Sequence, residues 1–190
     1  MDRANFLMGK MLIAMPGIGD PRFERSLLYV CAHDREHAMA LSVNNPVEGL
    51  SIRDLLRRLD VGTEETASND LVLIGGPVDH ERGFVLHSDD YMASDGASLP
   101  ICDGLALTAS REALEALAGK RTPPRVSALA LGYAGWGEGQ LEQEIRKNVW
   151  LTGDADEDLI FGPDYDAKWG RALQKLGVDP RLLSAEAGEA

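Results

Sequence analysis

The sequence predicts an α+β fold built around a β-sheet that is either mixed or closed on itself. Many short apolar runs have the length of strands, four other segments have helical periodicity, and the two kinds of segment follow each other in irregular order. A doubly wound fold would require regular alternation of strands and helices. With 190 residues, of which 44% are hydrophobic, the chain has enough material for one domain core.

Eight runs rich in Val, Ile, Leu and Tyr are bounded by turn-forming residues and are predicted to be strands. They span residues 11–15, 27–32, 39–43, 71–74, 84–87, 105–108, 126–133 and 149–152. Residues 71–74 and 105–107 are almost continuously apolar, which is typical of strands covered on both faces. Because other runs do not alternate cleanly, we expect a sheet that is mixed or closed.

The first two helices are predicted from capping residues and apolar spacing. Ser51 is expected to cap a helix whose buried face comprises Ile52, Leu55, Leu56 and Leu59. Ser110 is expected to cap a second helix, which ends where Gly119 can adopt a left-handed conformation.

Two more helices are predicted towards the C-terminus. One covers approximately residues 140–147, with Leu141 and Ile145 facing inward. The last is amphipathic and ends before Gly177, and its expected inward-facing residues are Trp169, Ala172, Leu173 and Leu176. We expect one domain over residues 1–183 and a loose acidic tail over residues 184–190.

The charge balance limits the kind of partner. Nineteen basic and thirty-one acidic side chains give a formal net charge of -12, a field that repels nucleic acid. Cys31 and Cys102 lie in apolar segments without CxxC spacing, as expected for reduced core thiols in a cytoplasmic protein. The N-terminal segment has neither a signal-peptide pattern nor a membrane span, so we expect no membrane partner.

The string His33-Asp34-Arg35-Glu36-His37 spells HxxEH, a zinc-binding pattern when it lies on a helix. Here it stands between two predicted strands, where the first and fifth side chains do not stack as they do on a helix. A polar turn between antiparallel strands is therefore the favoured interpretation, and no metal site is predicted.

The glycine-rich stretch contains Gly132, Gly135, Gly137 and Gly139, but neither a GxGxxG fingerprint nor a P-loop. Close backbone packing and tight turns are the favoured interpretation, and an anion-binding nest before the Gln140 helix is the alternative. No serine lies in a GxSxG motif. No cofactor is predicted.

Several blocks of the sequence resemble signatures of the YqgE/AlgH family of bacterial proteins, in the family's order and over nearly the whole chain. The matching blocks are Met11–Pro16, Asp20-Pro21 with Phe23, Arg25 and Ser26, then Tyr29, Cys31 and His33, Gly75–Val78, Arg82–His87, Leu131–Trp136, Gly139–Glu142, Asn148 and Trp150-Leu151. The resemblance implies a single bacterial, cytoplasmic α+β domain with a largely antiparallel or mixed, barrel-like sheet flanked by helices.

The resemblance implies little about activity. The AlgH name carries a proposed role as a transcriptional regulator of alginate synthesis, which the acidic charge does not favour through direct DNA contact. Two family glycines are replaced by His37 and Ala40, and the family's usual terminal Gly-His-Ala reads Gly188-Glu189-Ala190. These replacements argue against a required flexible backbone at residues 37–40. They also argue against a required histidine near the C-terminus.

Eight polar or aromatic residues in the matching blocks stand at predicted strand ends and turns, where scaffolds carry function. They are Arg25, Ser26, Arg82, His87, Tyr133, Trp136, Gln140 and Asn148. One interpretation is a shared ligand-binding cleft. The other is structural: Arg25 and Arg82 pair with carboxylates such as Asp20 or Glu142, while Gln140 and Asn148 satisfy loop backbone groups.

Three classes of function follow from these residues. The favoured class is a non-enzymatic binding or regulatory protein that acts on a protein partner or on a small anionic metabolite through Arg25, Arg82 and the glycine-rich turns. The second is an enzyme of unknown reaction with His87 as general base. The third is a regulator that contacts DNA directly.

Overall fold

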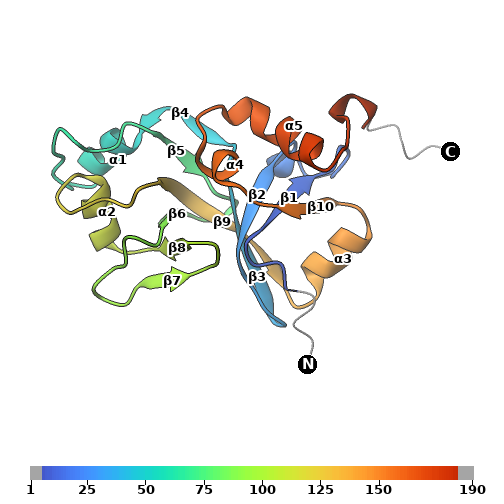
Figure 1. Cartoon of the computed structure of the whole chain (residues 1–190), viewed down its shortest axis with the longest axis horizontal. Helices are drawn as coiled ribbons and strands as arrows, with labels where there is room; N and C mark the ends of the chain where they lie inside the picture. The colour runs from blue at the N-terminus through green and yellow to red at the C-terminus, as the bar shows by residue number, and fades with distance from the viewer. Residues whose placement is uncertain (1–5, 184–190) are drawn as a thin grey trace. The chain divides into compact units, whose positions relative to one another are not determined.

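The structure is a computed structural model that describes residues 6–183 (Figure 1). Its strands are β1 (Lys10–Ala14), β2 (Leu27–His33), β3 (His37–Ser42), β4 (Pro46–Ser51), β5 (Leu71–Ile74), β6 (Val78–Ser88), β7 (Ser98–Pro100), β8 (Leu105–Thr108), β9 (Ser127–Gly137) and β10 (Trp150–Asp154). Its α-helices are α1 (Ile52–Arg58), α2 (Arg111–Leu117), α3 (Gln140–Arg146), α4 (Glu157–Phe161) and α5 (Tyr165–Lys175). Two 3-10 helices span Pro21–Phe23 and Pro180–Leu182. The predicted tail at 184–190 lies outside the described residues.

The α+β prediction is confirmed, since all eight predicted strands and all four predicted helices are present. Neighbouring strands pair antiparallel with one exception among those described: β5 runs parallel to β9, with Leu73 opposite Ala130. The sheet is therefore mixed. Strands β4 and β7 and helix α4 were not predicted.

The chain divides into two compact units, one formed by Met1–Asn45 with Ala134–Ala190 and the other by Pro46–Tyr133. Strand β9 contributes residues to both units. Its residues 134–137 belong to the first unit and pair with β3, and its residues 127–133 belong to the second unit and pair with β6. The expected single domain over residues 1–183 stays a prediction.

The core of the first unit is formed by alternate residues of β1, β2, β3, β9 and β10 together with α3. Its buried members are Leu12, Ala14, Leu28, Val30, Ala38, Ala40, Ala134, Trp136, Leu141 and Trp150. The intervening side chains of β1 and β2, such as Ile13 and Tyr29, are also buried, so these strands are covered on both faces. Helix α5 packs against β1 and β2, and the indole Nε1 of Trp169 donates to the Ala14 carbonyl oxygen at 2.8 Å.

The core of the second unit lies between α1, α2 and the strands β5, β6 and β9. Its buried members are Ile52, Leu56, Val61, Val72, Val85, Ala113, Leu117, Ala118 and Leu129. Ser51 caps α1 as predicted, since its hydroxyl accepts from the Asp54 backbone N–H. Gly119 adopts the expected left-handed conformation after α2, at φ 86°.

Three details of the helix predictions were wrong. Leu59 and Leu176 were expected to face inward but are 47% and 41% exposed, because each helix ends one residue earlier and the chain turns away. Ser110 is the residue before α2, yet its hydroxyl makes no capping bond and has no hydrogen-bond partner in the described part of the chain.

Candidate functional site

The segment between β1 and β2 places Arg25 in an unusual backbone conformation. Arg25 has φ 54°, in the left-handed region, which costs a residue with a side chain about 1–2 kcal/mol. The Asn44 side chain bridges both sides of this residue, because its Nδ2 donates to the Arg25 carbonyl oxygen at 2.8 Å and its Oδ1 accepts from the Leu27 N–H at 2.9 Å. The turn is therefore held in a strained form by a tertiary contact.

The Arg25 guanidinium lies over the ring of Trp169, 4.8 Å from its centroid. Trp169 is buried on α5 and its indole N–H is bonded to β1, so the platform under the guanidinium is fixed. Within residues 6–183, no carboxylate pairs with Arg25. The exposed guanidinium therefore keeps its hydrogen-bond donors for water or a ligand.

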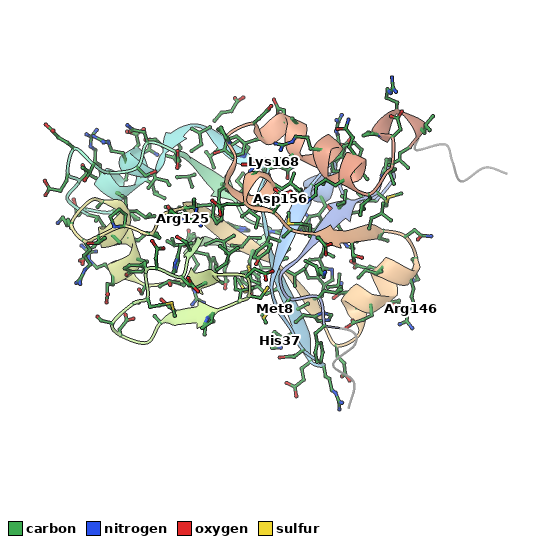
Figure 2. All side chains as sticks on the ribbon, viewed as in Figure 1. Met8, His37, Arg125, Arg146, Asp156 and Lys168 are labelled. Atoms are coloured by element: carbon green, nitrogen blue, oxygen red, sulfur yellow. The ribbon has the colours of Figure 1, made fainter. Side chains whose placement is uncertain are left out.

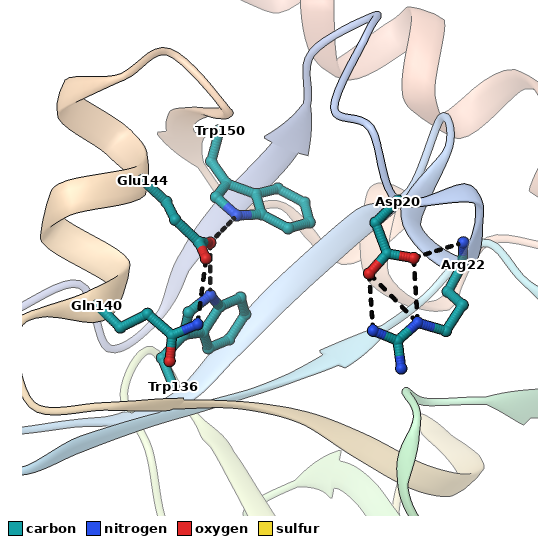
Figure 3. Close-up of polar contacts among 6 residues, drawn as sticks. All are labelled: Asp20, Arg22, Trp136, Gln140, Glu144 and Trp150. Atoms are coloured by element: carbon teal, nitrogen blue, oxygen red, sulfur yellow. Dashed lines mark hydrogen bonds and ion pairs between the residues drawn. The ribbon is translucent and has the colours of Figure 1, made fainter.

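The expected ion pairs of Arg25 and Arg82 with Asp20 or Glu142 were wrong. Asp20 caps the 3-10 helix Pro21–Phe23 and binds the side chain of Arg22, with 2.7 Å between Oδ2 and the guanidinium (Figure 3). Glu142 binds His33, with 2.6 Å between its Oε1 and Nε2. Asp20 thus has a partner two residues away in the sequence, whereas the partner of Glu142 comes from a distant strand.

Two hollows in the first unit are both lined by Pro21, Glu24, Arg25 and Trp169. The first, of about 670 Å³, is bounded mainly by apolar residues and glycines, namely Met15, Pro16, Gly17, Ile18, Gly19, Pro180 and Leu183, with Asp20 and Arg181. The second, of about 450 Å³, is bounded mainly by polar residues, namely Ser26, Asn44, Asn45, Tyr165, Asp166 and Arg22. Arg25 and Trp169 thus separate an apolar space from a polar one.

Local pairing cancels part of the charge around the two hollows. Arg22 is bonded to Asp20, and Arg181 is bonded to Asp179 at 2.8 Å. The hydrogen bonds from these arginines lower the pKa of both aspartates below its ordinary value. No ion pair within the described chain engages the remaining charged lining residues, which are Glu24, Arg25 and Asp166.

Lys168 fastens α5 next to this site (Figure 2). Its side chain is buried, and its Nζ donates to the carbonyl oxygens of Val43 and Ile160 at 3.0 Å each. Burial lowers the pKa of Lys168 to about 8. Asn44 and Trp169 position Arg25, and they directly follow Val43 and Lys168 in the sequence. The bond between Lys168 and Val43 therefore joins the two segments that carry them.

Trp136 and Gln140 lie in a different place and are occupied by structural bonds (Figure 3). The indole N–H groups of Trp136 and Trp150 both donate to Glu144 Oε2 at 2.8 Å, and Gln140 Nε2 donates to Glu144 Oε1 at 3.2 Å. The Gln140 Oε1 accepts from the Gly137 N–H, as the structural interpretation expected. Glu144 thus joins α3 to β9 and β10.

The arrangement of hydrogen bonds does not favour the alternative of an anion-binding nest before α3. The Gly137 N–H that would face an anion is bonded to Gln140. Gly139 adopts φ 68° as the N-cap of the helix, and Asn148 adopts φ 59° in the turn after it. These residues shape the ends of a seven-residue helix.

Arg82 and Tyr133, in the second unit, both contact Phe84. The Arg82 guanidinium lies 5.1 Å from the centroid of the Phe84 ring, and Tyr133 packs edge-on against the same ring at 5.7 Å. Arg82, like Arg25, has no carboxylate partner among residues 6–183. Neither Arg82 nor Tyr133 is among the residues that line the two hollows beside Arg25.

His87 is completely buried in the second unit. Its Nδ1 donates to the Ser88 carbonyl oxygen at 2.8 Å, which leaves Nε2 to accept from the Thr108 hydroxyl at 2.7 Å. Burial lowers the pKa of His87 below its ordinary value. The basic nitrogen of the expected general base is therefore engaged by a protein hydroxyl.

The HxxEH string forms the hairpin predicted for it, because His33 ends β2 and His37 begins β3. His33 accepts from the Leu7 N–H through Nδ1, whereas His37 lies beside Asp34. Among residues 6–183, no three histidine, cysteine or acidic side chains gather in a geometry that could hold a metal ion.

The structure therefore brings together only Arg25 and Ser26 of the eight candidates at the same hollow. Asn44, Lys168 and Trp169 belong to this site, but the sequence analysis did not select them. The Asn44-Asn45-Pro46 string is a turn signal, and Lys168 interrupts the apolar face of α5; these were the available clues. Their contact with Arg25 depends on tertiary packing.

Comparisons with known proteins agree with the family resemblance in the sequence. The AlgH-like family matches residues 11–181. A UPF0301 protein of Caulobacter vibrioides (strain NA1000 / CB15N) is 60% identical over 189 residues, covering 100% of this chain and 96% of the relative. UPF0301 protein SPO0296 of Ruegeria pomeroyi is 51% identical over 185 residues, covering 97% of this chain and 99% of the relative.

Solved structures show the same fold. The solution structure of the AlgH protein from Pseudomonas aeruginosa aligns with a TM-score of 0.78 and 36% identity, covering 100% of this chain and 99% of that one. The crystal structure of protein DIP2367 from Corynebacterium diphtheriae aligns with a TM-score of 0.72 over 96% of this chain and 92% of that one, at 18% identity, and shows the fold alone. Within residues 6–183, no helix has the length and apolar character needed to cross a membrane. Because the family match covers most of the chain and the relatives align over nearly all of it, the chain belongs to the AlgH-like family.

Proposed function

We propose that this chain is a non-enzymatic binding protein that holds a small ligand bearing a carboxylate or phosphate group at Arg25. The observation that carries the proposal is the Arg25 guanidinium, fixed over Trp169 between two hollows without a carboxylate partner among residues 6–183. A guanidinium with free donors binds carboxylates and phosphates through two parallel hydrogen bonds. Its strained backbone, held by Asn44, is a feature that often marks a ligand site.

Binding is favoured over catalysis because the described lining of the two hollows has no residue type that ordinarily titrates near neutral pH. The described lining of both hollows includes neither histidine nor cysteine. His87, which carried the enzyme alternative, is buried in the other unit with both ring nitrogens engaged. These facts support a site that recognises a ligand without transforming it.

Direct binding to DNA receives no support from the charge distribution. The net charge of -12 opposes association with a polyanion. The candidate site offers one cation and two acids that have no ion-pair partner within residues 6–183. A regulatory role through a protein partner remains the alternative, and it would be favoured if no small ligand binds.

A thermal-shift screen of the full chain against carboxylates, phosphates and nucleotides tests the proposal. A ligand that binds only the folded protein raises Tm by mass action, and we expect a shift of a few degrees for at least one acidic compound. Arg25→Ala should abolish the shift. Arg58→Ala is the matched control, because it removes an exposed arginine from α1 in the other unit.

The control separates loss of a site from loss of general positive charge. If Arg25→Ala and Arg58→Ala reduce the shift equally, the binding is nonspecific and the proposal fails. If no compound that bears a carboxylate or phosphate group, zwitterions included, shifts the Tm of the wild-type chain, the small-ligand function is wrong and the protein-partner alternative takes its place.

A further inference from the structure

The unpaired charges beside Arg25 have both signs, which restricts the ligand further. Glu24 borders both hollows together with Arg25, and Asp166 borders the polar hollow. Neither acid has an ion-pair partner among residues 6–183. A purely anionic ligand at Arg25 would face repulsion from two carboxylates, whereas a ligand that also carries an ammonium group would be attracted to them.

The two hollows also differ in polarity, and each one fits a different part of a ligand. Met15, Ile18 and Leu183 bound the larger hollow, where an apolar group removed from water would be stabilised. The smaller hollow contains the exposed amide of Asn45, which makes no hydrogen bond within the described chain. This amide can donate to a peptide carbonyl and accept from a peptide N–H.

The size of the apolar hollow favours more than one amino acid. Its volume of about 670 Å³ lies within the range of roughly 300–1,000 Å³ that accommodates drug-sized molecules. From the charges, polarity and volume together, we infer that the ligand is a short apolar peptide with free ends. Its carboxylate binds Arg25, its ammonium group lies near Asp166 and Glu24, and its apolar side chains fill the larger hollow. This inference rests on the proposed function.

Calorimetric titration of the full chain with a matched series of compounds tests the inference. Leucyl-leucine has all the required groups, acetyl-leucyl-leucine lacks the ammonium group, leucyl-leucinamide lacks the carboxylate, and glycyl-glycine lacks the apolar side chains. Leucine alone tests the effect of size. We expect leucyl-leucine to bind most tightly, loss of the ammonium group to raise Kd about threefold to tenfold, and loss of the carboxylate to abolish binding.

Two substitutions assign these preferences to residues. Asp166→Asn should reduce the difference between leucyl-leucine and its acetylated form, because one of the two acids that favour the ammonium group is gone. Asp158→Asn is the matched control, since it removes an exposed acid from α4 in the same unit but outside both hollows. The control should keep the full difference.

The outcomes distinguish the inference from the function on which it rests. If acetyl-leucyl-leucine or simple carboxylates bind as tightly as leucyl-leucine in an Arg25-dependent way, the peptide inference is wrong and the anion-binding function stands. If free leucine binds more tightly than leucyl-leucine, the ligand is an amino acid and the size argument is wrong. If no compound of this series or of the acidic screen binds through Arg25, both proposals fail.

Discussion

Asn44 holds Arg25 in its left-handed conformation by donating from its side-chain Nδ2 to the Arg25 carbonyl oxygen at 2.8 Å. The same amide accepts from the Leu27 N–H, which begins β2. One short side chain thus fixes the turn that carries the candidate ligand-binding cation. The backbone of Arg25 is strained where its side chain lines the two hollows, and the hydrogen bonds of the Asn44 amide offset that strain.

Replacing Asn44 by alanine should therefore destabilise the turn and weaken ligand binding together. Loss of the hydrogen bonds to the exposed Arg25 carbonyl and the partly buried Leu27 N–H is expected to lower the free energy of unfolding by about 1–3 kcal/mol. Urea unfolding measures this change. Asn45→Ala is the matched control for stability, because the neighbouring exposed amide has no hydrogen-bond partner within residues 6–183. It should change the free energy of unfolding by no more than about 0.5 kcal/mol. Equal effects of the two substitutions would contradict the role of Asn44.

Replacement of the half-buried Glu144 is predicted to destabilise the first unit. Glu144→Ala leaves the indole N–H groups of Trp136 and Trp150 without their acceptor, and each unpaired buried donor costs about 1–3 kcal/mol. We expect the free energy of unfolding to fall by about 2–4 kcal/mol in total. Unfolding followed by tryptophan fluorescence reports both the stability and the surroundings of the two indoles.

Glu144→Gln and Glu138→Ala complete this test. Glutamine keeps an oxygen acceptor, so Glu144→Gln should cost clearly less than Glu144→Ala. Glu138 is exposed in the turn before α3 and makes no bond with the rest of residues 6–183, so its removal should have little effect. A loss for Glu144→Ala no larger than that for Glu138→Ala would show that the indole bonds contribute nothing.

Lys168 should make stability depend on pH in the alkaline range. Its pKa is about 8 in the folded protein against 10.5 as a reference, so between these values the unfolded chain binds more protons and folding becomes more favourable as pH rises. The corresponding contribution is fully present above about pH 10.5 and lost as pH falls through 8. The shift corresponds to about 3 kcal/mol.

The comparison of wild type with Lys168→Met isolates this contribution from other titrating groups. Methionine has no proton to lose, so the stability of the wild type relative to the variant should increase between pH 8 and 10.5. Urea unfolding at several pH values measures the difference. Parallel stability curves over this range would mean that the ammonium group of Lys168 is not perturbed by burial.

The sequence predicted the elements of this fold better than it predicted the site. Apolar runs and capping residues located eight strands and four helices, because burial of one face dictates those patterns. Strand β4, with the sequence PVEGLS, and strand β7, with SLP, have few apolar residues and are mostly exposed or half-buried, so no apolar pattern marked them. Helix α4 has only five residues, too few for a period to be recognised.

The candidate site was predicted only in part, because its contacts join distant segments. Arg25 was selected from the matching blocks, but its expected partner was a carboxylate and its actual partner is the ring of Trp169. Trp169 was correctly expected to be buried, and burial alone gave no sign of the cation above it. Lys168 was overlooked since a lysine in an amphipathic helix normally faces water, whereas here two backbone carbonyls satisfy it.

Gly132 and Gly139 allow a final test of the glycine-rich stretch, which was interpreted as a packing feature. Both have positive φ, 74° and 68°, so alanine is strained at either position. At Gly132 a Cβ would lie 2.5 Å from the Gly76 carbonyl oxygen and 2.9 Å from that of Val78, whereas at Gly139 it would meet nothing within 4 Å. Only Gly132→Ala therefore forces backbone to move.

We expect Gly139→Ala to lower the free energy of unfolding by about 1–2 kcal/mol, the cost of the left-handed conformation. Gly132→Ala should cost at least about 2 kcal/mol more, because β9 must shift away from Gly76 and from the first residues of β6. Urea unfolding of the two variants gives the comparison directly, and a lysate solubility assay serves if Gly132→Ala does not fold. Similar losses for both variants would mean that close backbone approach does not explain the glycine at 132.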